Sequence, residues 1–169
     1  IDYSATFAPT LRMTTFRTLC AIACQLSFSL TQYDCVNAFL VPELEEELYL
    51  RLPEADLVNL HLPQHAVKNP VVRLVKTLYG LKNSPRYWSR HLFNTLRSMQ
   101  FEQSTADPCL WLRIVDGSLA AAIACFVDDA CVAARACDLP QIEAALKGVY
   151  KMTGGGPLSW FLGIKVNYN

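Results

Sequence analysis

The chain has 169 residues, of which 52% are hydrophobic and 18% charged, and its 15 basic residues balance its 15 acidic residues. This length suits one well-packed domain with room for a small extra lobe. The apolar run at residues 119–134 is too short to span a membrane and contains two Asp, and zero net charge argues against a strong free-standing nucleic-acid binder.

The N-terminal half predicts one helix followed by short strands. From Pro9 to about Leu30, apolar residues recur three and four apart, which predicts a helix. Residues 31–36 predict a strand whose only charge is Asp34. Residues 48–52 and 71–76 predict two further short strands, separated by a connector that contains Pro and Asn.

The C-terminal half begins with a helix that starts at Ser84 and Pro85, with Ser84 as the N-cap and Pro85 in the first turn. An apolar stripe that includes Tyr87 and Trp88 follows, and we expect these two side chains to be core. Residues 109–114 and 119–127 predict strands joined across a turn at residues 116–117.

The last segment predicts one more helix and one more strand. Asp138 and Pro140 start the helix, the glycine run at residues 154–157 ends it, and residues 159–166 form the strand. This order predicts an α+β fold, with an antiparallel sheet covered by helices on one face, as in the split βαβ motif.

Two features bear on the compartment. The seven Cys contain no Cys-x-x-Cys pair, which favours free thiols in a reducing compartment over a zinc site. The chain shows no signal peptide and does not begin with Met, which suggests a piece of a longer reading frame or an incomplete gene model.

The charges are segregated along the chain. Acidic residues cluster at residues 43–56, whereas residues 57–101 contain several Lys and Arg and no acid. The absence of compensating acid favours a phosphate-facing surface, and the alternative is an ordinary solvated helix face.

Asp128 and Asp129 lie side by side in the most hydrophobic segment, where an unpaired charge costs several kcal/mol. Neighbouring side chains of a strand point to opposite faces. Both acids therefore serve one site only if the chain turns there, with Asp128 ending a strand and Asp129 opening a tight turn. A hairpin turn without function is the alternative, because Asp suits turns, although the Gly of common hairpin turns is absent.

Asp34 is a third isolated acid, at the end of another predicted strand. Two strands that end in acids can meet if they are neighbours in one sheet. Carboxylates are the ligands that hard divalent cations prefer, and such a cluster is what two-metal phosphoryl transfer requires.

Several motifs of this chain resemble those of a known family. Residues 126–129 (Phe-Val-Asp-Asp) resemble the catalytic box of reverse transcriptases, and residues 31–40 resemble their first acidic motif. Residues 78–88 (Leu-Tyr-Gly-Leu-Lys-Asn-Ser-Pro-Arg-Tyr-Trp) are similar to the signature of copia-type LTR-retrotransposon reverse transcriptases. Further agreement, in the same order along essentially the whole chain, comes from residues 6–9, 12–17, 45–49, 107–108 and 160–164.

The resemblance implies an RNA-directed DNA polymerase domain of a retrotransposon Pol polyprotein, with a right-hand polymerase fold. Residues 30–40 and 84–158 would be palm, residues 1–29 and 41–83 partial fingers, and residues 159–169 a primer-grip strand. The thumb, RNase H and integrase would be absent from this chain, which would be inactive in isolation.

The resemblance also implies the site. Asp34 and Asp128 would be the primary ligands of two Mg²⁺ ions, which Mn²⁺ could replace, with Asp129 as the supporting acid. The residues implied at the nucleotide are Ala38, Phe39 as the steric gate under the sugar, Tyr79, Gly80 and, at the triphosphate, Arg17 or Arg12. The residues implied at nucleic acid are Lys82, Arg86 and the primer-grip residues Phe161, Leu162 and Gly163.

The partners implied are an RNA or DNA template with its primer, deoxynucleoside triphosphates and the remaining Pol domains, with no membrane. The location would be intracellular and cytoplasmic, within virus-like particles if the element is intact. Three alternatives stay open. The chain could be a non-enzymatic relic that at most binds nucleic acid, it could be a different two-metal phosphotransferase, and the ring of Phe39 could be plain core.

Overall fold

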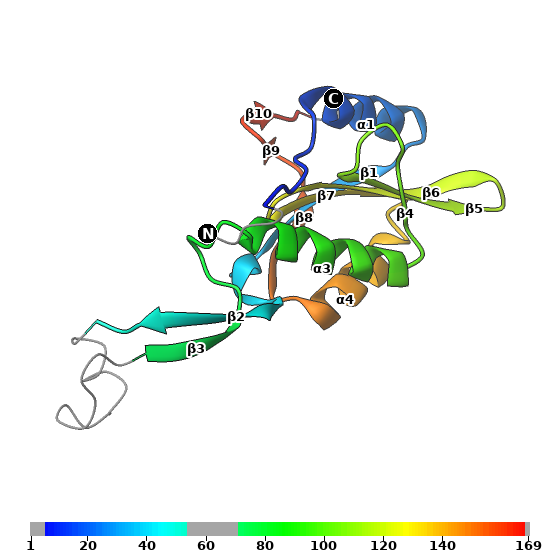
Figure 1. Cartoon of the computed structure of the whole chain (residues 1–169). Helices are drawn as coiled ribbons and strands as arrows, with labels where there is room; N and C mark the ends of the chain where they lie inside the picture. The colour runs from blue at the N-terminus through cyan, green and yellow to red at the C-terminus, as the bar shows by residue number, and fades with distance from the viewer. Residues whose placement is uncertain (1–5, 54–70, 168–169) are drawn as a thin grey trace.

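The computed structural model describes residues 6–53 and 71–167. Its centre is a sheet of six antiparallel strands in the order β4-β5-β6-β7-β1-β8 (Figure 1). The strands are β1 (Ser29–Cys35), β4 (Glu102–Gln103), β5 (Leu110–Val115), β6 (Ser118–Phe126), β7 (Asp129–Ala134) and β8 (Met152–Pro157). The predicted mixed fold with an antiparallel sheet is therefore confirmed.

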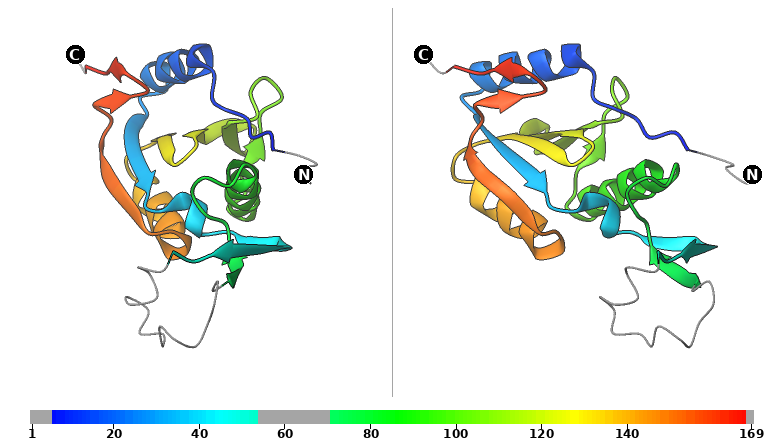
Figure 2. Two further views of the ribbon diagram at one scale, coloured as in Figure 1. Left: turned by 60° about the vertical axis from the view of Figure 1, so that its left-hand side comes forward. Right: turned by 90° about the vertical axis from the view of Figure 1, so that its left-hand side faces the viewer.

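Helices cover both faces of this sheet, so the prediction that they lie on one face is wrong. α3 (Ser84–Ser98) and α4 (Leu139–Val149) lie on one face, and α1 (Met13–Gln25) lies on the other (Figures 1 and 2). The reason is that β6 and β7 bury side chains on both faces of the sheet. Ile123 and Ala124, neighbours in β6, point to opposite faces and are both buried, so each face needs an apolar cover.

A short hairpin joins α1 on its face of the sheet. It consists of β9 (Trp160–Phe161) and β10 (Ile164–Lys165), and the ring of Phe161 packs 4.8 Å from the ring of Phe16 in α1. The single strand predicted at residues 159–166 is therefore wrong. The chain reverses at Leu162 and Gly163, which both have positive φ.

A second, two-stranded ribbon projects away from the main sheet (Figures 1 and 2). It pairs β2 (Glu43–Arg51) with β3 (Val71–Lys76), and the 3₁₀ helix η1 (Ala38–Leu40) connects β1 to it. The strand predicted at 71–76 is confirmed, and the one predicted at 48–52 begins earlier. The connector between them lies largely outside the described residues.

The structure corrects the end of one predicted helix and the N-cap of another. α1 ends at Gln25 rather than near Leu30, because the residues from Ser29 onward pair with β7 and β8. Ser84 is the first residue of α3 rather than its N-cap: Asn83 takes the cap position, and the Ser84 hydroxyl donates to the carbonyl of Leu78 at 2.7 Å.

The glycine run does not end a helix. α4 ends at Val149, and Gly154, Gly155 and Gly156 belong to strand β8. Gly154 has a φ of +93°, and a Cβ there would lie 2.3 Å from the carbonyl oxygen of Gln32. Glycine at this position therefore allows β8 to approach β1 closely.

Other local predictions are confirmed. The turn between β5 and β6 lies at Asp116 and Gly117, both with positive φ, and Tyr87 and Trp88 are buried.

Within residues 6–53 and 71–167, no helix is both long and apolar enough to cross a membrane.

Candidate active site

Three acids lie near one another at one end of the paired strands β1 and β7. Asp34, next to last in β1, lies directly opposite Asp129, the first residue of β7. Directly opposed residues of an antiparallel pair point to the same face. Asp128 is adjacent, because residues 127 and 128 form the two-residue turn between Phe126 and Asp129. The predicted turn was thus misplaced: Asp128 lies in the turn, and Asp129 opens the next strand.

The electrostatics of Asp129 show that the acids interact. Burial raises the pKa of Asp129, a hydrogen bond donated by the Gln32 side chain at 3.3 Å lowers it, and the charges of Asp128 and Asp34 raise it again. The net direction of the Asp129 pKa is upward, chiefly because burial disfavours the charged carboxylate, and the charges of Asp128 and Asp34 act in the same direction. A bound cation would relieve this repulsion.

The three acids suit a divalent metal in the type of their ligand atoms and in their position along the strands. Carboxylate oxygens are the ligands of Mg²⁺ and Mn²⁺, and the three acids lie at the same end of the β1–β7 pair. In the described part of the chain, no three His, Cys, Asp or Glu side chains are already gathered in an arrangement ready to hold an ion. Binding therefore requires the carboxylates to turn toward a common point.

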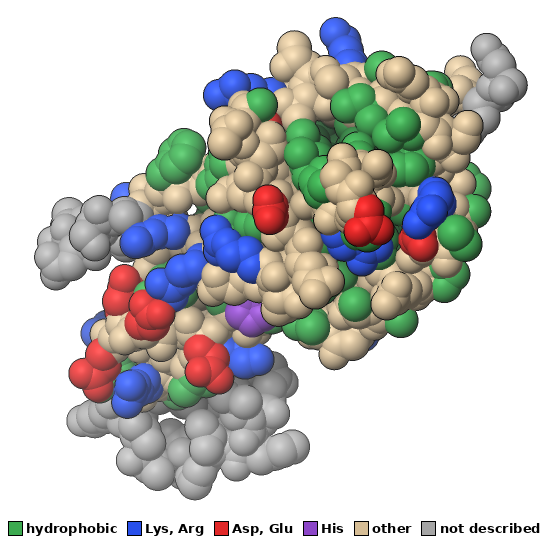
Figure 3. All heavy atoms as spheres, turned by 90° about the vertical axis from the view of Figure 1, so that its right-hand side faces the viewer, with side chains coloured by type: hydrophobic (Ala, Val, Ile, Leu, Met, Phe, Trp, Pro, Cys, Tyr) green, Lys and Arg blue, Asp and Glu red, His purple; other side chains and the backbone are tan. Residues whose placement is uncertain are grey.

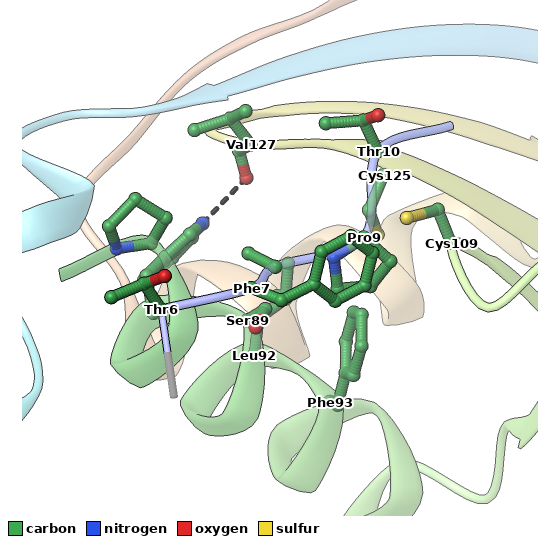
Figure 4. Close-up of a pocket in the computed structure, with 13 residues that line it drawn as sticks. Thr6, Phe7, Pro9, Thr10, Ser89, Leu92, Phe93, Cys109, Cys125 and Val127 are labelled. Carbon is green, nitrogen blue, oxygen red and sulfur yellow. Dashed lines mark hydrogen bonds between the residues drawn. The ribbon is translucent and has the colours of Figure 1, made fainter. Parts of the chain in front are cut away.

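The turn that carries Asp128 is strained and held on two sides. Val127 has a φ of +55°, a conformation that costs a β-branched residue about 1–3 kcal/mol. The backbone N–H of Cys35 donates to the carbonyl of Asp128 at 2.9 Å. The indole N–H of Trp88 donates to the carbonyl of Val127 at 2.6 Å, the dashed line in Figure 4. The sequence predicts Trp88 as core only. A two-residue turn without Gly was the one sign in the sequence that the turn needs a supporting contact.

The residues implied at the nucleotide lie partly together. The ring of Phe39 in η1 is 5.0 Å from the ring of Tyr79 at an interplanar angle of 62°, and Tyr79 is 52% exposed. The hydroxyl of Thr77 donates to the carbonyl of Phe39 and ties the two segments. Ala38 is buried beneath, and Gly80, with positive φ, is exposed beside Tyr79.

The remaining implied residues are spread over the molecule. Arg17 is exposed on α1, which covers one face of the sheet. Phe39 packs against the core cluster on the other face. Lys82 and Arg86 are exposed just before and within the first turn of α3. Phe161 is 1% exposed, so its ring contributes to the shape of the β9–β10 hairpin rather than to its surface.

Residues 57–101 contain no acid, but folding brings acidic side chains from β2 close to some of their basic and polar side chains. Arg90 of α3 forms an ion pair with Glu45 of β2, and the Asn83 amide donates to Glu46 at 2.7 Å. Figure 3 shows basic and acidic side chains close together on the face it presents. Folding thus places acidic residues of β2 beside Arg90 and Asn83, although residues 57–101 contain no acid of their own.

Comparison with known proteins identifies the family. A family model described as "Reverse transcriptase (RNA-dependent DNA polymerase)" matches residues 1–169. The chain belongs to this reverse transcriptase family.

Several retrotransposon proteins are similar to this reverse transcriptase chain. It is 30% identical over 167 residues to the "Retrovirus-related Pol polyprotein from transposon TNT 1-94" of Nicotiana tabacum, covering 98% of this chain and 12% of that protein. It is 34% identical over 112 residues to the corresponding polyprotein from transposon RE1 of Arabidopsis thaliana (66% of this chain and 7% of that protein).

A yeast relative, "Putative transposon Ty5-1 protein YCL074W" of Saccharomyces cerevisiae, is 31% identical over 136 residues, which are 79% of this chain and 42% of that protein. No solved structure matches the chain. The copia-type resemblance is thus confirmed, and this reverse transcriptase chain spans only a small part of the plant polyproteins it matches.

Proposed function

We propose that this chain forms the catalytic centre of an RNA-directed DNA polymerase of a copia-type retrotransposon. The reaction is attack of a primer 3′-hydroxyl on the α-phosphate of a deoxynucleoside triphosphate, with pyrophosphate as the leaving group. The observation that carries the proposal is the register that sets Asp34 opposite Asp129, beside the turn with Asp128, in a chain of the reverse transcriptase family.

Each acid has a role in this proposal. Asp34 and Asp128 hold two divalent cations, and Asp129 supports them from the first position of β7. When bound, these cations activate the primer hydroxyl and stabilise the charge on the phosphate. The protein supplies position, because β1 and the β6–β7 turn are both fixed by backbone hydrogen bonds.

The aromatic pair of Phe39 and Tyr79 forms the nucleotide side of the site. η1 directly follows β1, so Phe39 lies close along the chain to Asp34. A ring at this place is suited to exclude a 2′-hydroxyl by contact. We assign Ala38 and Gly80 to the same nucleotide, but not Arg17, because α1 covers the opposite face of the sheet from the cluster that Phe39 contacts. We assign Lys82, Arg86 and the hairpin of Phe161, Leu162 and Gly163 to template and primer.

In this proposal the six-stranded sheet is the palm, the β2–β3 ribbon is part of the fingers and β9–β10 is the primer grip. The plant relatives are Pol polyproteins much longer than this chain. We therefore propose that thumb, RNase H and integrase segments act with it, and that residues 1–169 alone do not sustain primer extension. Misplacing a reacting group by about 1 Å costs on the order of a hundredfold in rate.

A Mn²⁺ titration of the chain tests the acids directly. Cation binding to the folded state raises its melting midpoint by mass action. We expect Mn²⁺ to raise the midpoint of the parent and of Asp116→Asn, an exposed acid at the tip of the β5–β6 hairpin, but not of Asp128→Asn. An unchanged midpoint in the parent, or an equal shift in Asp128→Asn, contradicts the metal site.

Primer extension tests the reaction itself. The chain should be assayed in place of the matching 167 residues of the tobacco polyprotein. We expect extension with Mg²⁺ that Asp128→Asn abolishes. Binding of primer–template without any extension would instead identify a non-enzymatic relic that retains nucleic-acid binding.

A further inference from the structure

The β6–β7 turn is held by two hydrogen bonds that come from different elements. The Cys35 N–H, which reaches Asp128, belongs to the sheet, whereas the indole N–H of Trp88 reaches the Val127 carbonyl from helix α3. Val127 has positive φ and thus lies where a β-branched residue is disfavoured. The turn keeps this conformation only if its surroundings impose it.

Val127 packs against the core on one side and borders a cavity on the other. A cavity of about 530 Å³ lies beside the turn, and Val127, Trp88, Leu92, Phe93, Cys109 and Cys125 are among its lining residues (Figure 4). The turn is therefore not enclosed by side chains on every side. The Trp88 hydrogen bond is a polar contact that crosses from α3 to the turn.

The donor is itself fixed in orientation. Trp88 is 3% exposed, and its ring lies edge-on to the ring of Tyr150, with centroids 5.3 Å apart. The Tyr150 hydroxyl in turn contacts His91 Nδ1 at 2.9 Å and Thr95 Oγ1 at 2.7 Å, which lie about one and two turns beyond Trp88 along α3. This arrangement leaves the indole N–H directed at the Val127 carbonyl.

We propose that Trp88 is a positioning residue for the metal-binding acids: its indole N–H holds the Val127 carbonyl and so keeps Asp128 in place beside Asp34. Trp88 acts through the turn and touches neither nucleotide nor primer. The inference rests on the proposed function, because it assigns a purpose to the turn that carries Asp128. The positioning role requires the indole N–H group of Trp88, and not only the bulk of its ring.

The structure offers a matched control for that requirement. Trp111 is fully buried in the same hydrophobic cluster as Trp88, but its indole nitrogen has no hydrogen-bond partner among the described residues. Trp88→Phe and Trp111→Phe therefore remove similar volume, and only the first removes a hydrogen bond. Benzothienylalanine at position 88 replaces the N–H by sulfur at nearly unchanged shape, so it keeps the test valid if Trp88→Phe fails to fold.

The experiment measures the Mn²⁺ dissociation constant of the chain by electron paramagnetic resonance, with metal-free melts as a check of folding. Loss of a group that orients metal ligands weakens metal binding by roughly 10- to 100-fold. We expect that loss in Trp88→Phe and in the benzothienylalanine variant, and no change in Trp111→Phe.

The outcomes separate the inference from the proposed function. Mn²⁺ binding in the parent with equal affinity in the position-88 variants overturns the role of Trp88 and leaves the metal site standing. Equal weakening in Trp111→Phe also overturns it, since general loss of core packing then explains the effect. Absence of Mn²⁺ binding in the parent refutes the proposed metal site, and the positioning role with it.

Discussion

Replacement of Asp107 by Asn tests the contact that fastens α1 to the main sheet. Asp107 is fully buried in the loop before β5. Its carboxylate accepts hydrogen bonds from the Thr15 hydroxyl at 2.6 Å, from the backbone N–H of Arg12 at 3.0 Å and from the backbone N–H of Cys109 at 2.9 Å. One side chain thus satisfies donors at the start of α1 and at the start of β5.

The expected loss follows from these three bonds. Asn keeps one carbonyl oxygen, but its NH₂ group must face at least one of the donors that the carboxylate accepts. A hydrogen bond to a charged group contributes about 1.5–3 kcal/mol, and a buried donor left unpaired costs about 1–3 kcal/mol. We therefore expect Asp107→Asn to lower the free energy of unfolding by roughly 2–4 kcal/mol. For a domain of this size that corresponds to a fall in the melting midpoint of about 5–15 °C.

Urea unfolding and thermal melts measure this change, with Asp116→Asn as the control. Asp116 carries the same side chain on an exposed hairpin tip, where its substitution is expected to change stability by no more than about 0.5 kcal/mol. If Asp107→Asn proves as stable as Asp116→Asn, the three hydrogen bonds do not hold α1 to the sheet and the reasoning is refuted.

The same residue predicts an acid limit. Burial acts to raise the pKa of Asp107, but the hydrogen bonds from Thr15, Arg12 and Cys109 outweigh it and lower the pKa below the ordinary value of 3.8. A carboxyl whose pKa is lower in the folded state stabilises the fold above its unfolded value, and this stability is lost as the pH falls through the folded value. The parent should therefore lose stability below about pH 4, and Asp107→Asn should lose less of it over that range.

Three further predictions concern the nucleotide, the phosphates and the sheet. Phe39→Ala in the chimeric polyprotein should increase ribonucleotide incorporation without weakening Mn²⁺ binding; unchanged sugar discrimination would mean that the ring is core. Neutralising Lys82 and Arg86 should weaken primer–template binding and flatten its dependence on salt, because fewer counterions are released, and an unchanged slope would place both on an ordinary solvated face. Gly154→Ala should destabilise the fold by more than about 1–2 kcal/mol, the cost of left-handed backbone alone, since its Cβ would clash with β1. Gly156→Ala, where a Cβ meets nothing within 4 Å, should change much less in the same melts.

The features that the sequence determined are those set by neighbours along the chain. The turn at Asp116 and Gly117 is one example, because both residue types adopt left-handed backbone readily. The strand at residues 71–76 and the start of α3 at Ser84 and Pro85 are others, although the cap itself was assigned one residue late. The family was also available from sequence, since its motifs are runs of specific residues in a given order.

Tertiary structure decided what depends on segments that are distant in sequence. The faces of the sheet that need covering follow from the pairing of β6 with β7, and the glycine run became strand β8 because it lies against β1. Arg90 meets Glu45 only because β2 folds back onto α3. Likewise, Trp88 reaches the Val127 carbonyl across a separation of 39 residues, which no local pattern encodes. Propensity and turn chemistry act within a few residues, whereas burial, ion pairing and hydrogen bonding are satisfied by whichever groups the completed fold brings together.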